Sequence, residues 1–128
     1  MEQNMQEVLL FFDGHMDALP LYLAFWEKVE KRFPESGMRV QKTQITFYNR
    51  HVFACVSFAR VLRKAQMPEN CIVVTLGLPY ALSSERVAVR TEPYPGRWTT
   101  HFVIGRQEEL DDEFMGWVEQ AYGFAQAK

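Results

Sequence analysis

The sequence is poor in cysteine. Cys55 and Cys71 are its only two cysteines, and both fall in apolar, strand-like runs without Cys-x-x-Cys spacing. Disulfide frameworks and thiolate metal sites need more cysteines or closely spaced pairs. We therefore expect two buried, reduced thiols, and from them a cytoplasmic protein.

Long hydrophobic runs are also missing. The run from Val8 to Phe12 is too short for the apolar part of a signal peptide, and the preceding residues include Glu2 but no Lys or Arg. No segment approaches the length that crosses a bilayer. We expect neither a leader nor a membrane partner.

Motifs of known chemistry are absent as well. The seven glycines form neither a Gly-x-Gly-x-x-Gly pattern nor a phosphate loop, and Ser83-Ser84 lies outside any Gly-x-Ser-x-Gly turn. The histidines His15, His51 and His101 lack metal-ligand spacing. We expect no metal and no cofactor, and the sequence leans away from an enzyme.

Length and composition fit one domain. The chain has 128 residues, of which 48% are hydrophobic and 14% aromatic. That is enough for one substantial core but not for two. We expect a single domain over residues 1–128.

Charge is sorted along the chain. Residues 1–38 carry three basic and seven acidic side chains, and residues 107–128 carry one and six. Residues 39–106 carry ten basic side chains against Glu69, Glu85 and Glu92, a net charge of +7 in a chain whose total is −2. Such sorting bears on partners more than on fold, and it directs attention to a basic surface.

The N-terminal part predicts two helices. The first ends at Asp13-Gly14, because Gly14 can adopt the left-handed conformation at a helix end. The second begins near Asp17, tolerates Pro20 in its first turn and ends before Pro34. Its apolar side chains recur at helical spacing: Leu19, Tyr22, Trp26, Val29 and Phe33.

The middle of the chain changes to the period of two that is typical of strands. A hairpin is expected around residues 48–51, and a stiff turn is expected at Glu92–Gly96 because it contains two prolines. Strands are expected around 45–47 and over 52–58, 71–78, 86–91 and 98–104.

The last element is an amphipathic helix. Phe114, Trp117, Val118 and Ala121 form one stripe, and acids near its start suit the positive end of the helix dipole. The predicted fold class is therefore α+β, with a mainly antiparallel sheet of about five strands. The two N-terminal helices and the C-terminal helix are expected to pack on one face of that sheet.

Alternation also predicts a binding surface. With the apolar strand residues facing the helices, the opposite face should be basic and rich in hydrogen-bond donors, fit for a phosphate or carboxylate. The turn at Tyr94–Trp98 should add a guanidinium beside an indole. The alternative is a solvated sheet face, with Trp98 at the core rim and Arg97 paired with an acidic helix. The predicted ligand-binding residues are Lys42, Gln44, Arg90, Arg97, Trp98 and His101.

Two stretches carry a resemblance to a known family. At Val40–Phe47 and Glu92–His101 the chain resembles a bacterial family of unknown function, DUF5655, and shorter pairs extend the likeness from about Val8 to Tyr122. The resemblance implies a small α+β domain with no established reaction. The family pattern often ends the second stretch with two histidines, and here Thr100 stands in place of the first.

Two classes of function remain after these steps. One is a module that binds an anionic small molecule on the basic sheet face, with nucleic acid less favoured because the overall charge is negative. The other is a homotypic or protein–protein interaction domain, in which acidic helices meet the basic sheet of a neighbour. An enzyme of unrecognised type comes third.

Overall fold

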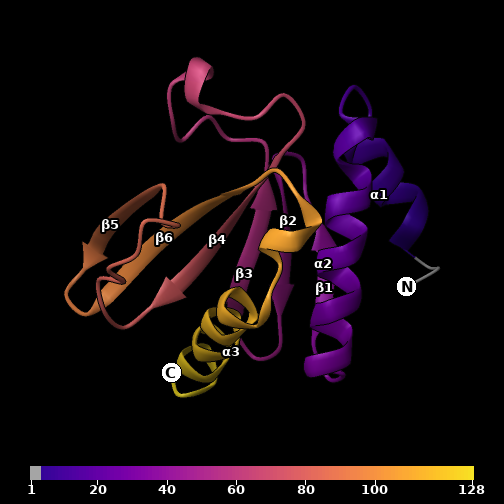
Figure 1. Ribbon diagram of the computed structural model, residues 1–128. Coiled ribbons are helices and arrows are strands. Elements are labelled where there is room, and N and C mark those ends of the chain that lie inside the picture. Colours follow the sequence, from indigo (N-terminus) through magenta and orange to yellow (C-terminus); the bar gives the residue numbers. More distant parts are fainter. Residues whose placement is uncertain (1–3) are drawn as a thin grey trace.

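An antiparallel sheet of six strands carries the fold (Figure 1). The computed structural model describes residues 4–128. The spatial order of the strands is β1-β2-β3-β4-β6-β5. Their bounds are β1 Gly37–Val40, β2 Gln44–Tyr48, β3 Val52–Ser57, β4 Ile72–Leu78, β5 Val89–Tyr94 and β6 Arg97–Ile104.

Helices α2 (Leu19–Arg32) and α3 (Asp112–Gln126) cover one face of the sheet (Figure 1). Phe25 of α2 packs edge-to-face on Phe47 of β2, with ring centroids 5.4 Å apart, and Phe102 of β6 meets Phe114 of α3 at 5.1 Å. Helix α1 (Met5–Phe11) lies beside α2 at the edge of this layer. The expected α+β class and antiparallel sheet are thus confirmed.

The prediction of about five strands was wrong by one. The additional strand is β1, which begins at Gly37 and pairs with β2 at the edge of the sheet. A Cβ at Gly37 would lie 2.7 Å from the Tyr48 ring, so the ring packs closely over the backbone of β1 and would have to move to admit a side chain there. The short turn at residues 41–43 then separates two strands where periodicity indicated one.

The expected stiff turn at Glu92–Gly96 is much shorter than predicted. Strand β5 continues through Pro93 to Tyr94, which an edge strand permits because one side of its backbone needs no partner. Gly96 has a φ of 75°, so the turn itself needs glycine at that position.

Helix ends follow the sequence signals in most places. Gly14 has a φ of 83°, Pro20 lies in the first turn of α2, and the Asp111 carboxylate accepts a hydrogen bond from the Phe114 N–H at 3.0 Å. Asp17 does not cap α2, because a 3-10 turn at Met16–Ala18 precedes it and Ala18 occupies the cap position.

The strand register defines two faces of the sheet. The row Phe47, Ala54, Leu76 and Thr100 faces the helices, and we call this side the helix face. The neighbouring row belongs to the opposite side, which we call the open face: Thr46, Cys55, Thr75 and His101. Within residues 4–128, no helix is long and apolar enough to cross a membrane.

Candidate functional site

The predicted binding residues do not share one face. Arg90 pairs with Thr100 on the helix face, whereas His101 lies on the open face. The expectation of one common face was therefore wrong. The cause is an irregularity where β5 begins: Ala88 N–H donates to the His101 carbonyl at 2.8 Å although Val89 is the register partner of His101. Two residues then oppose one, as in a β-bulge, and the alternation that places Arg90 is reversed.

The remaining predicted residues lie at opposite ends of the sheet. Gln44 is connected through Ser57 and Val73 to Val103, near the end of β6. Arg97 begins the same strand six residues earlier, which corresponds to about 20 Å along an extended chain. Lys42 therefore lies at one corner with Gln44, and Arg97 and Trp98 lie near the diagonal one.

Two of the residues that were predicted to bind an anion already form hydrogen bonds within the protein. The Arg90 guanidinium donates to the Leu82 carbonyl at 3.0 Å. His101 Nδ1 lies 2.8 Å from the Thr75 hydroxyl, and burial lowers the pKa of the imidazole. A histidine that favours its neutral form is a weak partner for an anion.

Part of the charge sorting is satisfied within the chain. Arg86 donates to both carboxylate oxygens of Asp111 at 2.9 and 3.1 Å and to Glu113 at 2.9 Å. Arg32 of α2 forms ion pairs with Asp112 and Glu119. The acids of α3 are thus largely engaged by these two arginines.

Three of the cations outside these ion pairs lie close together in one long connection. Residues 59–70, which we call the basic loop, link β3 to β4 and contain Arg60, Arg63 and Lys64 against Glu69. Among residues 4–128, the ion pairs involve Arg32 and Arg86 but none of these three cations. The loop projects beyond the end of the sheet (Figure 1).

The basic loop is nevertheless held in place. A 3-10 turn at Lys64–Gln66 is closed by the Gln66 carboxamide, which accepts from the Arg63 N–H at 3.2 Å. Pro68 packs against Gly105, and its Cγ lies 2.8 Å from the position that a Cβ on Gly105 would occupy. The missing side chain of Gly105 therefore lets the loop pack directly on the backbone at the end of β6.

A cleft of about 450 Å³ lies beside the basic loop. Arg60 and Lys64 supply positive charge at its wall, and Met67, Cys71 and Val73 supply apolar surface. His15, from the turn between α1 and α2, and Phe58 complete it. We call this hollow the cation cleft.

Aromatic rings are stacked at the cation cleft. The His15 and Phe58 ring centroids are 3.9 Å apart with an interplanar angle of 12°, and Phe11 stacks on Phe58 at 5.2 Å. Because His15 is exposed, the stack ends at solvent beside the loop cations. Such an arrangement suits a ligand that combines a planar ring with negative charge.

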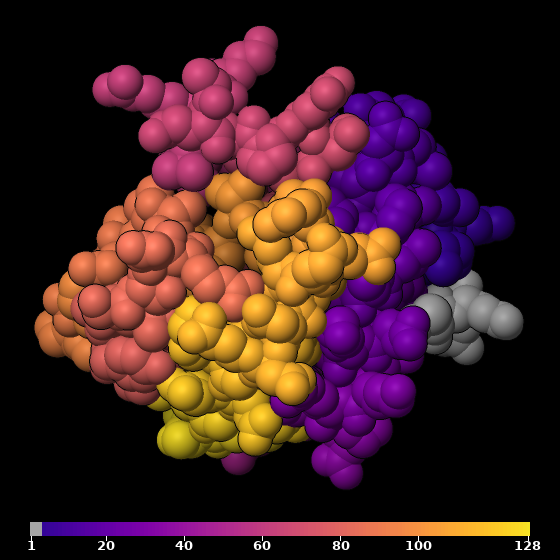
Figure 2. Space-filling model, viewed as in Figure 1, coloured from indigo at the N-terminus to yellow at the C-terminus, as the bar shows by residue number. Residues whose placement is uncertain are grey.

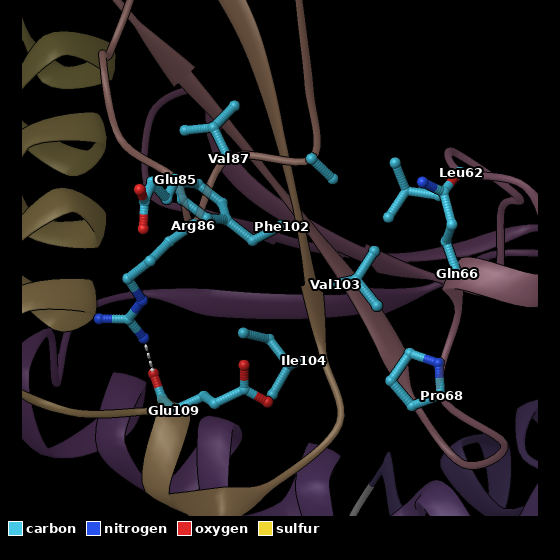
Figure 3. Close-up of a pocket in the computed structure, with 11 residues that line it drawn as sticks. Leu62, Gln66, Pro68, Glu85, Arg86, Val87, Phe102, Val103, Ile104 and Glu109 are labelled. Carbon is cyan, nitrogen blue, oxygen red and sulfur yellow. Dashed lines mark hydrogen bonds between the residues drawn. The ribbon is translucent and has the colours of Figure 1, made fainter.

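A second hollow, of about 580 Å³, lies on the other side of the basic loop (Figure 2). In that view it is bordered by the loop in magenta, by residues near 85 in salmon and by residues near 105 in orange. The end of β6 crosses it, with Val103 on the side of Gln66 and Pro68 and with Phe102 and Ile104 on the opposite side (Figure 3). We call it the edge groove.

Charge distinguishes the two hollows. The cation cleft has Arg60 and Lys64 at its wall against Glu69. The edge groove has Glu85, Glu109 and Arg86, and the charge of Arg86 is taken up by Asp111 and Glu113. An anion is therefore favoured in the cation cleft and disfavoured in the edge groove.

Neither thiol is an activated nucleophile. Burial raises the pKa of Cys55 to about 11 and also raises that of Cys71. Both are free cysteines, and both are partly exposed where full burial was expected. In the part of the chain that the structure describes, no group of three or more His, Cys, Asp or Glu side chains is placed to hold a metal ion.

Sequence reasoning missed the residues of the cation cleft. The signal for Arg60 and Lys64 was present, since a 12-residue connection with three cations is long for a loop within a compact domain. The contribution of His15 could not be predicted from the sequence, because it depends on a tertiary contact between the turn that joins α1 to α2 and the end of β3.

Comparison with protein families identifies the chain. The model of DUF5655, described as a domain of unknown function, matches residues 10–125, and the chain belongs to this family. No match was found among curated proteins or among solved structures.

Proposed function

We propose that this protein binds an anionic small molecule in the cation cleft. The observation that supports this most is the pairing of Arg60 and Lys64, cations outside the ion pairs of the described chain, with the exposed end of the His15–Phe58 stack. A ligand that carries a planar ring and a phosphate or carboxylate would satisfy both features.

Charge-assisted hydrogen bonds from Arg60 and Lys64 would be strong enough to hold an anionic ligand. A hydrogen bond to a charged group contributes about 1.5–3 kcal/mol. Arg60 can offer a planar guanidinium to two oxygens of one phosphate or carboxylate, and Lys64 adds a compact charge. Val73 and Met67 supply apolar surface to exclude water from one side of the ligand.

The proposal keeps only part of the predicted site. Gln44 pairs with Ser57, which directly precedes Phe58, so Lys42 and Gln44 lie at the same end of the sheet as the cation cleft. Arg90, Arg97, Trp98 and His101 have no part in it. Arg60 and Lys64 take the role that the sequence assigned to a sheet face.

The homotypic alternative has less support. It requires acidic helices that are free to meet the basic surface of a neighbour, but Asp111 and Glu113 engage Arg86, and Asp112 and Glu119 engage Arg32. Sedimentation at low and high salt separates the two ideas. Self-association that weakens as salt rises is expected only for the homotypic contact.

Calorimetric titration with AMP, ribose 5-phosphate and benzoate tests the proposal. Arg60→Ala or Lys64→Ala should weaken the affinity for AMP by about tenfold or more, the equivalent of one lost charge-assisted hydrogen bond. Arg97→Ala is the matched control, because it removes an exposed arginine at the distant corner and should leave the affinity unchanged. Equal losses in all three variants, or no binding of any of the three anions, would contradict the proposal.

A further inference from the structure

We infer that the edge groove is a second binding site, which takes an extended peptide segment of another protein. The segment adds one short strand to the sheet beside β6, at Val103. This inference is independent of the anion site, because it rests on backbone groups on the other side of the basic loop.

The backbone of β6 shows where the strand would be added. Along a strand, the N–H and C=O groups of alternate residues point to the same edge. The His101 carbonyl accepts from Ala88 N–H, so the backbone groups of His101 point towards β5, and those of Val103 point the same way. The ladder with β5 ends at the Val89–His101 pair. Val103 is the register partner of Val73 on β4, but its backbone N–H and C=O point away from β4 and are not hydrogen-bonded to Val73.

The next position along the same edge is already capped. The Glu109 carboxylate accepts from the Gly105 N–H at 2.8 Å and from the Arg106 N–H at 2.9 Å. In the chain as described from residue 4 onward, the N–H and C=O of Val103 have no partner and open into the groove. On either side of it along this edge, the His101 carbonyl and the Gly105 N–H are already hydrogen-bonded. One residue of an extended peptide supplies the complementary pair, which is the geometry of strand addition.

Side chains on both sides of this edge suit apolar residues. A peptide residue paired with Val103 places its side chain on the side of Val103, towards Leu62 and Pro68 (Figure 3). Its two neighbours in the peptide point to the opposite side, beside Phe102 and Val87. The groove therefore selects an extended segment with an apolar residue at its centre.

Charge and shape define the source of the peptide. Glu85 and Glu109 at the groove disfavour an acidic segment. A second copy of this chain, joined edge to edge, would bring two projecting basic loops together, each with Arg60, Arg63 and Lys64. The occupant is thus an extended segment of a different protein that carries no acidic residues.

Selection of random octapeptides displayed on phage tests the inference. Selection on the wild-type protein should enrich peptides with apolar residues at alternating positions. The same selection on Val103→Pro should not, because proline removes the N–H that faces the groove. Proline is tolerated on a strand edge whose N–H is unpaired, so the variant should melt close to the wild type. Synthetic versions of the enriched peptides should bind Val103→Pro about tenfold more weakly.

A second measurement keeps the test decisive if that variant fails to fold. Methylation of each peptide nitrogen in turn should weaken binding to the wild type by about tenfold at one position, the amide that donates to the Val103 carbonyl, and less elsewhere. Three results would overturn the inference: no enriched peptide, binding that no methylation affects, or dimers of the wild type that Val103→Pro dissociates. The last would show that a second copy fills the groove.

Discussion

Pro68 rests on the backbone of Gly105, with its Cγ 2.8 Å from the place of a missing Cβ. This contact joins the basic loop to the end of β6 and separates the cation cleft from the edge groove. Both proposed sites therefore depend on a residue that has no side chain.

Gly105→Ala should loosen the basic loop. The added methyl group would overlap the Pro68 ring, so the loop must shift. Trypsin should then cleave the native protein after Arg60, Arg63 or Lys64 several-fold faster. Gly116→Ala is the matched control, because a Cβ at that position in α3 meets open space and should stabilise the helix by about 0.5–1 kcal/mol. Equal cleavage rates in the two variants would show that packing of the loop on Gly105 does not hold the loop in place.

Arg86 should stabilise the fold in a pH-dependent way. Its hydrogen bond lowers the pKa of Asp111, so the stabilisation is present above the pKa that the carboxyl has in the unfolded chain and is lost as pH falls through the lower folded value. Arg86→Met should cost about 1–2 kcal/mol at pH 7, since the pairs are partly exposed.

Urea unfolding from pH 7 to pH 2 measures this effect. The difference between Arg86→Met and the wild type should shrink at acidic pH, as the pH falls through the lowered folded-state pKa of Asp111. A difference that stays constant over the whole range would assign the role of Arg86 to its packing on Trp117 instead, where its guanidinium lies 5.6 Å from the ring centre.

The sequence predicted the local elements better than their register. The helical stripe around Phe114 and Val118 and the turn at Gly96 follow from spacing and backbone chemistry, and both are present. The face of Arg90 does not follow from spacing, because one additional residue at the start of β5 reverses it. The cation cleft could not be predicted for a related reason: it brings together His15 and Lys64, which α2 and three strands separate in the sequence, through tertiary packing alone.

Two buried hydroxyl groups should be dispensable. In the region that the structure describes, the Tyr22 hydroxyl and the Thr100 Oγ1 are buried without hydrogen-bond partners, and burial raises the pKa of Tyr22. Tyr22→Phe and Thr100→Val should therefore be neutral or stabilising in thermal unfolding. Tyr122→Phe is the contrast, because its hydroxyl accepts from Asn49 Nδ2 at 2.8 Å, and its loss should cost about 1 kcal/mol. Destabilisation by Tyr22→Phe equal to that by Tyr122→Phe would reveal a partner for the buried phenol.

The two thiols should differ in their accessibility. Both pKa values are raised by burial, so labelling at pH 7.5 should be slow, but Cys71 borders the cation cleft and should react before Cys55. Saturating AMP should slow the labelling of Cys71 and leave Cys55 unaffected. Mass spectrometry of labelled Cys71→Ser isolates the signal of Cys55, and faster labelling of Cys55 in the wild type would contradict this assignment.

The most direct test of the central claim, an anion in the cation cleft, is a nuclear magnetic resonance titration of the ¹⁵N-labelled protein with AMP. We expect saturable amide shifts that centre on His15, Lys64 and Val73, with little change at Arg90 on β5 or at Arg97, which begins β6 at the other end of the sheet. Shifts that centre on β5 and the start of β6, or no saturable shift at millimolar AMP, would contradict it.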